Sequence, residues 1–173
     1  MASLNDAGVR ELLNGRFIGT LGTHGPDGSV HMVAVWYWFD GRDIFVATSS
    51  RSRKARNLDE NPKVSLMIDS RDVAASRGIT VVGTAQMIQG EESRKRNLEV
   101  HRKYLSAAAM ADARVGPVFA GWDDVTLQIT PVSVIAWDMR EADKQVFGGA
   151  FEGTPIIFCL WSGEVYSGSF LPS

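Results

Sequence analysis

One strand constrains the fold more than any other segment of this 173-residue chain. The residues SVHMVAVWYWF (29–39) are rich in β-branched and aromatic side chains, which favour extended structure. Side chains alternate along a strand, so Trp36 and Trp38 point to one side, while Tyr37 and Phe39 point to the other. A strand that is apolar on both faces is buried on both. One face can fill a barrel, and the other needs a helix, a ligand or a second subunit to cover it.

Turn residues on either side of this strand predict two hairpins. HGPDG (24–28) combines Pro with two glycines and separates the strand from an apolar strand at 16–23. On the other side, the Asp-Gly pair at 40–41 is a strong short-range hairpin signal and leads into DIFVAT (43–48). Three consecutive antiparallel strands are therefore expected before residue 50.

The remaining pattern predicts an antiparallel barrel with two or three peripheral helices, a mainly β fold of the α+β class. Further strands are expected at 63–69, 77–88, 125–130 and 132–138, with the last two joined at Pro131, and in the tail at 154–161. Helices are expected at 4–14, 50–61 and 90–105, with an extension over 106–121 that breaks at Gly116-Pro117. The buried sides of the first and third helices are expected to carry Val9, Leu12 and Leu13, and Leu98, His101, Tyr104 and Leu105.

Composition excludes several classes of protein. Eighteen Lys and Arg against 20 Asp and Glu argue against a general nucleic-acid binder. No apolar run is long enough for a transmembrane helix, and the N-terminus lacks a signal-peptide pattern. The single Cys159 excludes a disulfide framework, and His24, His31 and His101 show no metal-ligand spacing. We expect a cytoplasmic protein without a metal site or a membrane partner.

Within this slightly acidic chain, ATSSRSRKARNLDENP (47–62) gathers hydroxyls and basic side chains after a strand. A helix that begins near Ser52 would present free N–H groups and a partial positive charge, which favour anions. Arg53 and Lys54 can add a forked guanidinium and a point charge. The segment is therefore a phosphate site or, alternatively, a solvated basic helix face, since no P-loop or GxGxxG motif accompanies it.

Several motifs, taken in order, resemble one family. They are GTLGTHGPDGSVH (19–31), VWYWFDG (35–41), the Thr48 to Leu58 segment with SRKARNL, and NPKVSLMID (61–69), followed by PVSVIAWD (131–138). This set is similar to the pyridoxamine 5'-phosphate oxidase-like superfamily, and most similar to its branch of F420-dependent deazaflavin oxidoreductases. The resemblance implies a six-stranded antiparallel split β-barrel of the FMN-binding type over residues 1–138. Residues 139–173 would form a C-terminal tail packed on the same domain.

The resemblance also implies a homodimer with the cofactor at the interface. The strand matching 32–37 would run beside the cofactor ring, Thr48 would contribute a hydroxyl, and the Arg-Lys pair would hold the phosphate. Trp137 would approach from the other subunit. Local hydrogen-bonding chemistry adds Ser50 and Ser52. The expected cofactor-binding residues are Met32, Val33, Ala34, Val35, Trp36, Thr48, Ser50, Ser52, Arg53, Lys54 and Trp137.

The expected activity is hydride transfer from reduced F420 to an electron-poor double bond of a small organic substrate, such as an enone, quinone or imine. The cofactor carries this chemistry, so no catalytic side chain is assigned. The tail lacks the Arg/His segment of true pyridoxamine phosphate oxidases, which argues against vitamin B6 oxidation. Two alternatives stay open: an FMN-dependent oxidoreductase, and a cofactor-binding protein without turnover. Asp123 and Asp124 are interpreted as a surface turn pair, and Tyr104 as a packing residue.

Overall fold

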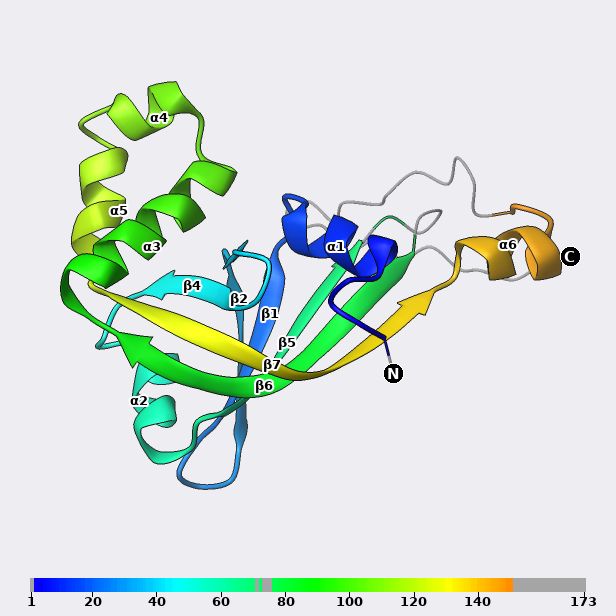
Figure 1. The fold of residues 1–173 in the computed structure, drawn as a ribbon, viewed down its shortest axis with the longest axis horizontal. Coiled ribbons are helices and arrows are strands. Elements are labelled where there is room, and N and C mark those ends of the chain that lie inside the picture. The colour runs from blue at the N-terminus through cyan, green and yellow to red at the C-terminus, as the bar shows by residue number, and fades with distance from the viewer. Residues whose placement is uncertain (1, 71, 73–75, 151–173) are drawn as a thin grey trace, which may run out of the picture.

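The computed structural model describes residues 2–70, 72 and 76–150 (Figure 1). Its helices are α1 (Ala7–Asn14), α2 (Arg53–Glu60), α3 (Gly90–Tyr104), α4 (Ala107–Ala111), α5 (Gly116–Trp122) and α6 (Arg140–Phe147). Its strands are β1 (Gly19–His24), β2 (Val30–Val35), β3 (Trp38–Phe39), β4 (Ile44–Thr48), β5 (Lys63–Ser70), β6 (Arg77–Ile88) and β7 (Val125–Asp138). The predicted strand at 154–161 lies outside the described residues.

All strand pairs are antiparallel, and the strands form one curled sheet in the order β2-β1-β5-β6-β7-β4-β3. The mainly β barrel with peripheral helices is therefore confirmed, with seven strands rather than six. Figure 1 shows α3, α4 and α5 gathered beyond β4 at one end, with α1 over the middle of the sheet. The core lies inside the curl, where α1 contributes Val9, Leu12 and Leu13 as predicted.

The long strand predicted at 29–39 is divided in the structure. Its first half, β2, pairs with β1, and its second half, β3, pairs with β4 at the other end of the sheet order. Residues 36–37 therefore join the two ends of the curled sheet. The alternation is as predicted, because Tyr37 and Phe39 are buried while Trp36 and Trp38 are half-exposed.

Tyr104 of α3 hydrogen-bonds the backbone where β2 ends. The Tyr37 N–H donates to the Tyr104 hydroxyl at 3.3 Å, and that hydroxyl donates to the Phe17 carbonyl at 2.7 Å. The Tyr37 hydroxyl in turn donates to the Leu12 carbonyl at 2.6 Å. The strand breaks at this position because side chains, rather than a neighbouring strand, satisfy its polar groups.

Residues 125–138 form one strand instead of the two predicted. Gly83 pairs with Pro131 and Val82 with Ser133, so Val132 is an extra residue in a β-bulge. Proline cannot donate to the ladder, and a bulge accommodates that loss without ending the strand.

Two further predictions are only partly correct, for local reasons. Gly116-Pro117 begins α5 instead of breaking a helix, because proline is well suited to the first turn, where its N–H is not needed. In α3 His101 is buried and Tyr104 and Leu105 are half-buried, as predicted, but Leu98 is 37% exposed, and Ser93, Asn97 and Val100 are buried instead. The α3 face that meets β7 is mostly polar, so apolar spacing did not identify it.

Candidate functional site

A cleft of about 270 Å³ lies between the end of β2 and the strand β4, with α2 and α5 beside it. It is lined by Ile18, Ala34, Val35, Trp36, Ala47, Lys54, Phe119 and Asp123. Four of the expected cofactor-binding residues meet here: Ala34, Val35, Trp36 and Lys54. The cleft thus combines apolar walls with one cation and one carboxylate, which is typical of small-molecule sites.

The N-terminus of α2 lies beside this cleft. Ser52 is the N-cap, since its hydroxyl accepts from the Ala55 N–H at 3.3 Å. The buried Thr48 donates to the same Ser52 oxygen at 3.3 Å, which ties the end of β4 to the start of the helix. The helix therefore begins at Ser52, near where it was predicted to begin, and the Ser52 hydroxyl has a structural partner.

Ser50 has an internal carboxylate as its partner. Its N–H and its hydroxyl donate to the two Asp124 oxygens at 2.7 and 2.6 Å. These hydrogen bonds lower the pKa of Asp124, so the carboxylate is ionised at neutral pH. Asp124 is exposed, as predicted for a surface turn residue. Its hydrogen bonds to Ser50 also hold the loop that precedes α2.

Arg53 and Lys54 point in different directions from the first turn of α2, as neighbouring helical residues do. Arg53 is exposed, and its Nη2 lies 3.4 Å from the Ser29 hydroxyl near the 24–28 turn. Lys54 is half-buried in the cleft, where burial lowers its pKa and the charge of Asp123 partly opposes that shift. The structure therefore does not bring the pair to one point, and their joint phosphate contact stays a prediction.

Trp36 is held between two other aromatic rings. Tyr104 stacks on Trp36 with 4.9 Å between the ring centroids and 6° between the ring planes. Phe119 also stacks on Trp36, with 5.2 Å between the centroids. Burial raises the pKa of Tyr104 to about 12, so its hydroxyl stays protonated. Tyr104 is thus a packing residue, as predicted, and stacking restricts the Trp36 surface that a ligand could reach.

The edge of β2 offers backbone groups to a ligand. In the part of the chain that the structure describes, β2 is the end strand of the sheet order, and one side of its backbone has no strand partner there. Met32 is 62% exposed on this strand, and Val33 packs partly against the core. These positions fit a ring that takes backbone hydrogen bonds along 32–36.

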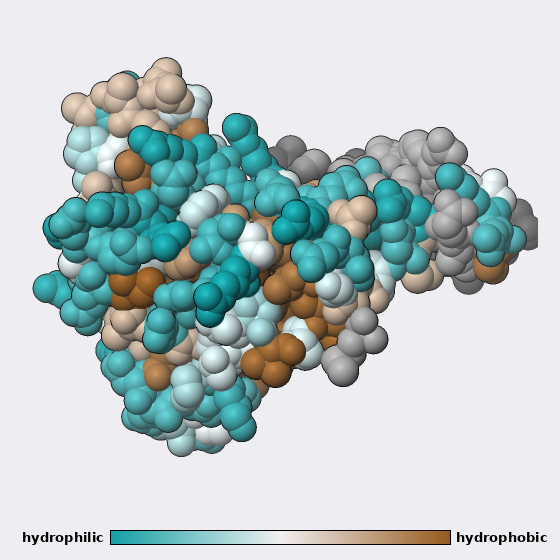
Figure 2. Space-filling model, in the orientation of Figure 1, coloured by the Kyte–Doolittle hydropathy of each residue, from teal (hydrophilic) through white to brown (hydrophobic). Residues whose placement is uncertain are grey.

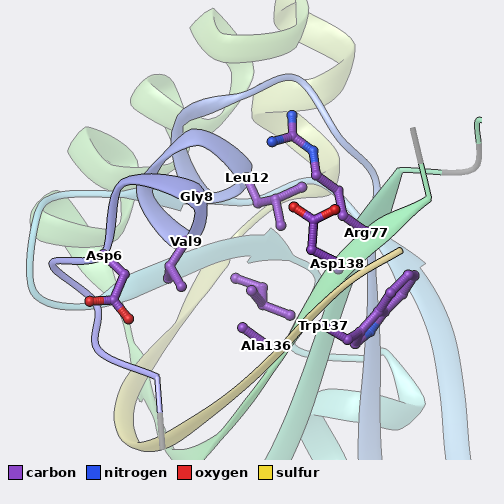
Figure 3. A pocket seen from close by; sticks show the side chains of 10 residues that line it. Asp6, Gly8, Val9, Leu12, Arg77, Ala136, Trp137 and Asp138 are labelled. Carbon is purple, nitrogen blue, oxygen red and sulfur yellow. The ribbon is translucent and has the colours of Figure 1, made fainter. Parts of the chain in front are cut away.

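Trp137 lies away from the cleft, at the end of β7. A second pocket, of about 210 Å³, is formed there between α1 and the ends of β6 and β7 (Figure 3). Figure 3 shows Trp137 and Asp138 pointing to opposite sides of β7, with Val9 and Leu12 of α1 nearby. Trp137 packs over Gly78, where a Cβ atom would lie 2.6 Å from the ring. Within one chain, Trp137 therefore lies apart from the expected cofactor-binding residues that line the cleft.

Sequence reasoning missed two residues at the cleft. Asp123 lines the cleft, and its Oδ2 lies 2.7 Å from Nε2 of the buried His101. The signal was the polar spacing of Ser93, Asn97 and His101 in α3, four residues apart, which marks one helix face. Among the residues that the structure describes, no group of three or more His, Cys, Asp or Glu could hold a metal ion.

Comparison with known proteins identifies the family. Residues 6–137 match the pyridoxamine 5'-phosphate oxidase family, so the chain belongs to that family of flavin-binding oxidoreductases. A search of the curated proteins found no match. No helix in the described part of the chain is long and apolar enough to cross a membrane.

Solved structures share the fold. A conserved hypothetical protein from Mycobacterium tuberculosis is 28% identical, with a TM-score of 0.68, covering 82% of this chain and 88% of its own. An F420 reductase is 22% identical with a TM-score of 0.61, covering 75% of this chain and 98% of its own. A heme-binding protein from Mycobacterium smegmatis is 22% identical with a TM-score of 0.56, covering 74% of this chain and 51% of its own.

Proposed function

We propose that this protein is an F420-dependent reductase that binds the deazaflavin in the cleft between β2 and β4. The observation that carries the proposal is the position of Lys54, a half-buried cation in a cleft beside the N-terminus of α2. A buried cation without a salt bridge among the described residues favours an anionic ligand. The fold shared with an F420 reductase supports the choice of cofactor.

The arrangement of the chain fits such a ligand. The free edge of β2 can receive the ring by backbone hydrogen bonds, and Lys54 can receive the phosphate. The exposed Arg51 and Arg56 can receive the acidic tail that distinguishes F420 from FMN. When bound, reduced F420 supplies a hydride to an electron-poor double bond of an enone, quinone or imine type. The protein's own contribution is to orient the substrate and to exclude water.

A homodimer forms part of this proposal. Exposed apolar side chains share the outer face of the sheet, among them Met32, Val82, Ile135 and Trp137. Register places Met32 and Val82 in one row, since Met32 pairs with Gly22, Gly22 with Ser65, and Ser65 with Val82. Figure 2 shows hydrophobic surface open to solvent over the middle of the molecule. A second copy covering this face would bring its Trp137 toward the cofactor, as the family resemblance implies.

Titration with F420 and with FMN, followed by quenching of tryptophan fluorescence, tests the cofactor. We expect tight binding of F420, and reoxidation of reduced F420 when an electron-poor substrate is added. Lys54→Ala should weaken F420 binding by about 1.5–3 kcal/mol, the range for a hydrogen bond to a charged group. Lys95→Ala is the matched control, because Lys95 is exposed and pairs with Glu91 on α3.

The other outcomes identify the alternatives. Tight binding of FMN without F420 would favour an FMN-dependent oxidoreductase, and binding without turnover would favour a carrier. Sedimentation of Ile135→Glu tests the dimer, since a charge on this 57% exposed residue should separate the subunits. If the variant becomes monomeric and keeps full F420 affinity, the cofactor does not lie at the interface.

A further inference from the structure

Asp123 presents a fixed carboxylate to the cleft. Its Oδ2 is hydrogen-bonded to Nε2 of His101 at 2.7 Å, and its Oδ1 has no hydrogen bond within the described residues. The His101 side chain is only 4% exposed, and that of Asp123 is 18% exposed. An ionised carboxylate only accepts, so the imidazole N–H donates to Oδ2 and leaves Oδ1 for a ligand.

The main chain of Asp123 is fixed as well. Nδ2 of Asn97 donates to the Asp123 carbonyl at 2.8 Å and to the Val125 carbonyl at 3.2 Å. Residues from successive turns of α3 therefore hold both the backbone and the side chain of Asp123. A group that is already held in place loses little entropy when a ligand binds it, so this carboxylate is prepared for recognition.

The charges around Asp123 favour a cationic ligand once the cofactor is present. Lys54 is the cation that faces Asp123 across the cleft, and the two form no salt bridge in the described structure. If the cofactor phosphate takes the Lys54 charge, no lysine or arginine among the described residues forms an ion pair with Asp123. Asp124 is already engaged with Ser50. The aromatic residues Trp36 and Phe119 also line the cleft, so the walls around the carboxylate are mostly apolar.

We propose that the substrate is a planar protonated imine, whose N–H⁺ donates to Oδ1 of Asp123. This inference rests on the proposed function, in which reduced deazaflavin is the hydride donor. The hydride forms a new C–H bond at the imine carbon. The electron pair of the C=N double bond would move to nitrogen, so the iminium would become a neutral amine. The reduced deazaflavin would supply both electrons, and its ring N–H proton would leave to solvent. No proton is needed in this step.

Electrostatics distinguishes the imine from the other candidate substrates. Hydride addition to an enone or quinone puts negative charge on oxygen, which the Asp123 carboxylate would oppose and which would need a proton donor. Addition to an iminium removes positive charge instead. A nearby carboxylate also raises the pKa of a bound imine, which keeps the substrate in its reactive protonated form.

Binding of a cationic probe tests the recognition step without turnover. The probe is 4-aminoquinolinium, a planar cation at neutral pH that carries a ring N–H, compared with the neutral isostere 1-naphthylamine on full-length protein saturated with F420. We expect the cation to bind about 10- to 100-fold tighter, the range for a hydrogen bond or contact to a charged group, and Asp123→Asn to abolish that preference. Asp59→Asn, which removes one exposed charge on α2, should keep it. A preference that survives Asp123→Asn would overturn the proposal.

His101 is a positioning residue in this account. Gln at position 101 can place its amide nitrogen near the position of Nε2, whereas Leu cannot donate. We therefore expect His101→Gln to retain most of the preference for the cationic probe and His101→Leu to lose it. Equal loss in both folded variants would show that shape, rather than the hydrogen bond, fixes Asp123.

Turnover separates this inference from the proposed function. With F420 bound, Asp123→Asn should lower kcat/KM for 3,4-dihydroisoquinoline by about 10- to 100-fold and change kcat/KM for 2-cyclohexenone by less than about 3-fold. A wild-type enzyme that reduces the enone but not the imine would overturn this inference and leave the proposed function standing. Absence of F420 binding would overturn both.

Discussion

Helices α1 and α3 both pack on the barrel, but they bury different kinds of side chain. α1 buries Val9, Leu12 and Leu13 in the core. The buried face of α3 is mostly polar, with Ser93, Asn97 and His101 bonded to the start of β7 and the turn before it. Apolar burial supplies stability that does not depend on direction, whereas buried hydrogen bonds fix atoms at defined positions. The first helix stabilises the fold, and the third positions the cleft.

The largest expected effect is on the apolar side of this comparison. Leu13 is fully buried, so Leu13→Ala should destabilise the protein by about 2–5 kcal/mol through lost burial and a cavity. Urea unfolding measures the change. Ligand affinity of the folded variant should stay close to wild type. A large loss of affinity in folded protein would mean that α1 also shapes the cleft.

A smaller loss of stability is expected on the polar side, but with an effect on the site. Asn97→Ala removes the bonds to the Asp123 and Val125 carbonyls and leaves the Thr126 hydroxyl without one of its partners. The cost should be about 1–3 kcal/mol, the range for buried polar groups left unsatisfied. Unlike Leu13→Ala, it should also reduce binding of the cationic probe. Unchanged probe affinity in Asn97→Ala would contradict the claim that α3 positions the cleft whereas α1 only stabilises the fold.

Lys103 joins the two helices, and its contribution should depend on pH. Its Nζ donates to the Leu13 carbonyl at 2.8 Å and lies 3.6 Å from the centroid of the Tyr37 ring. Burial lowers the pKa of Lys103 to about 7, below its ordinary value of 10.5. Between these values the unfolded chain binds more protons than the folded one, so stability attributable to Lys103 rises with pH.

We therefore expect wild type to gain about 1 kcal/mol relative to Lys103→Met between pH 7 and pH 9, a value reduced for partial solvent exposure. Denaturant unfolding of both proteins at each pH measures the difference. Because all other titratable groups are the same in the two proteins, their contributions cancel in the difference between wild type and Lys103→Met. A difference that is flat over this range would mean that Lys103 stays charged in the folded protein.

The smallest effect is expected at the residue whose burial was predicted wrongly. Leu98→Ala should change the free energy of unfolding by less than about 0.5 kcal/mol, because Leu98 is 37% exposed on α3. Comparison with Leu13→Ala uses the same substitution on the two helices. A loss of several kcal/mol at Leu98 would mean that another surface covers this residue in solution, such as a second subunit.

Much of the fold could be predicted because its signals are local. Turn residues at 24–28 and 40–41 marked the hairpins, and β6 spans residues 77–88 as alternation predicted. Predictions were wrong where long-range contacts decide. The hydroxyl of Tyr104, 67 residues away from Tyr37, stands at the break between β2 and β3. The bulge at Val132 depends on the neighbouring β6 rather than on Pro131 alone.

The candidate site divides in the same way. The basic segment with Ser52 and Lys54 was visible in the sequence, because capping and charge belong to neighbouring residues. The roles of Asp123 and His101 were not visible, since 22 residues separate them and their hydrogen bond exists only after α3 packs on β7. Ser50 looked free for an anion, and only the folded chain shows Asp124 on it.

The ordered motifs of the sequence identified the family by resemblance. Periodicity and turn chemistry, which act over a few residues, predicted the antiparallel strands and the position of the basic helix. Tertiary structure alone decided where the 29–39 strand divides, which side of α3 is buried and which carboxylate enters the cleft. These features depend on satisfying polar groups after burial, and their partners are distant in the chain. A local pattern can require that such a group be satisfied, but it cannot name the residue that does so.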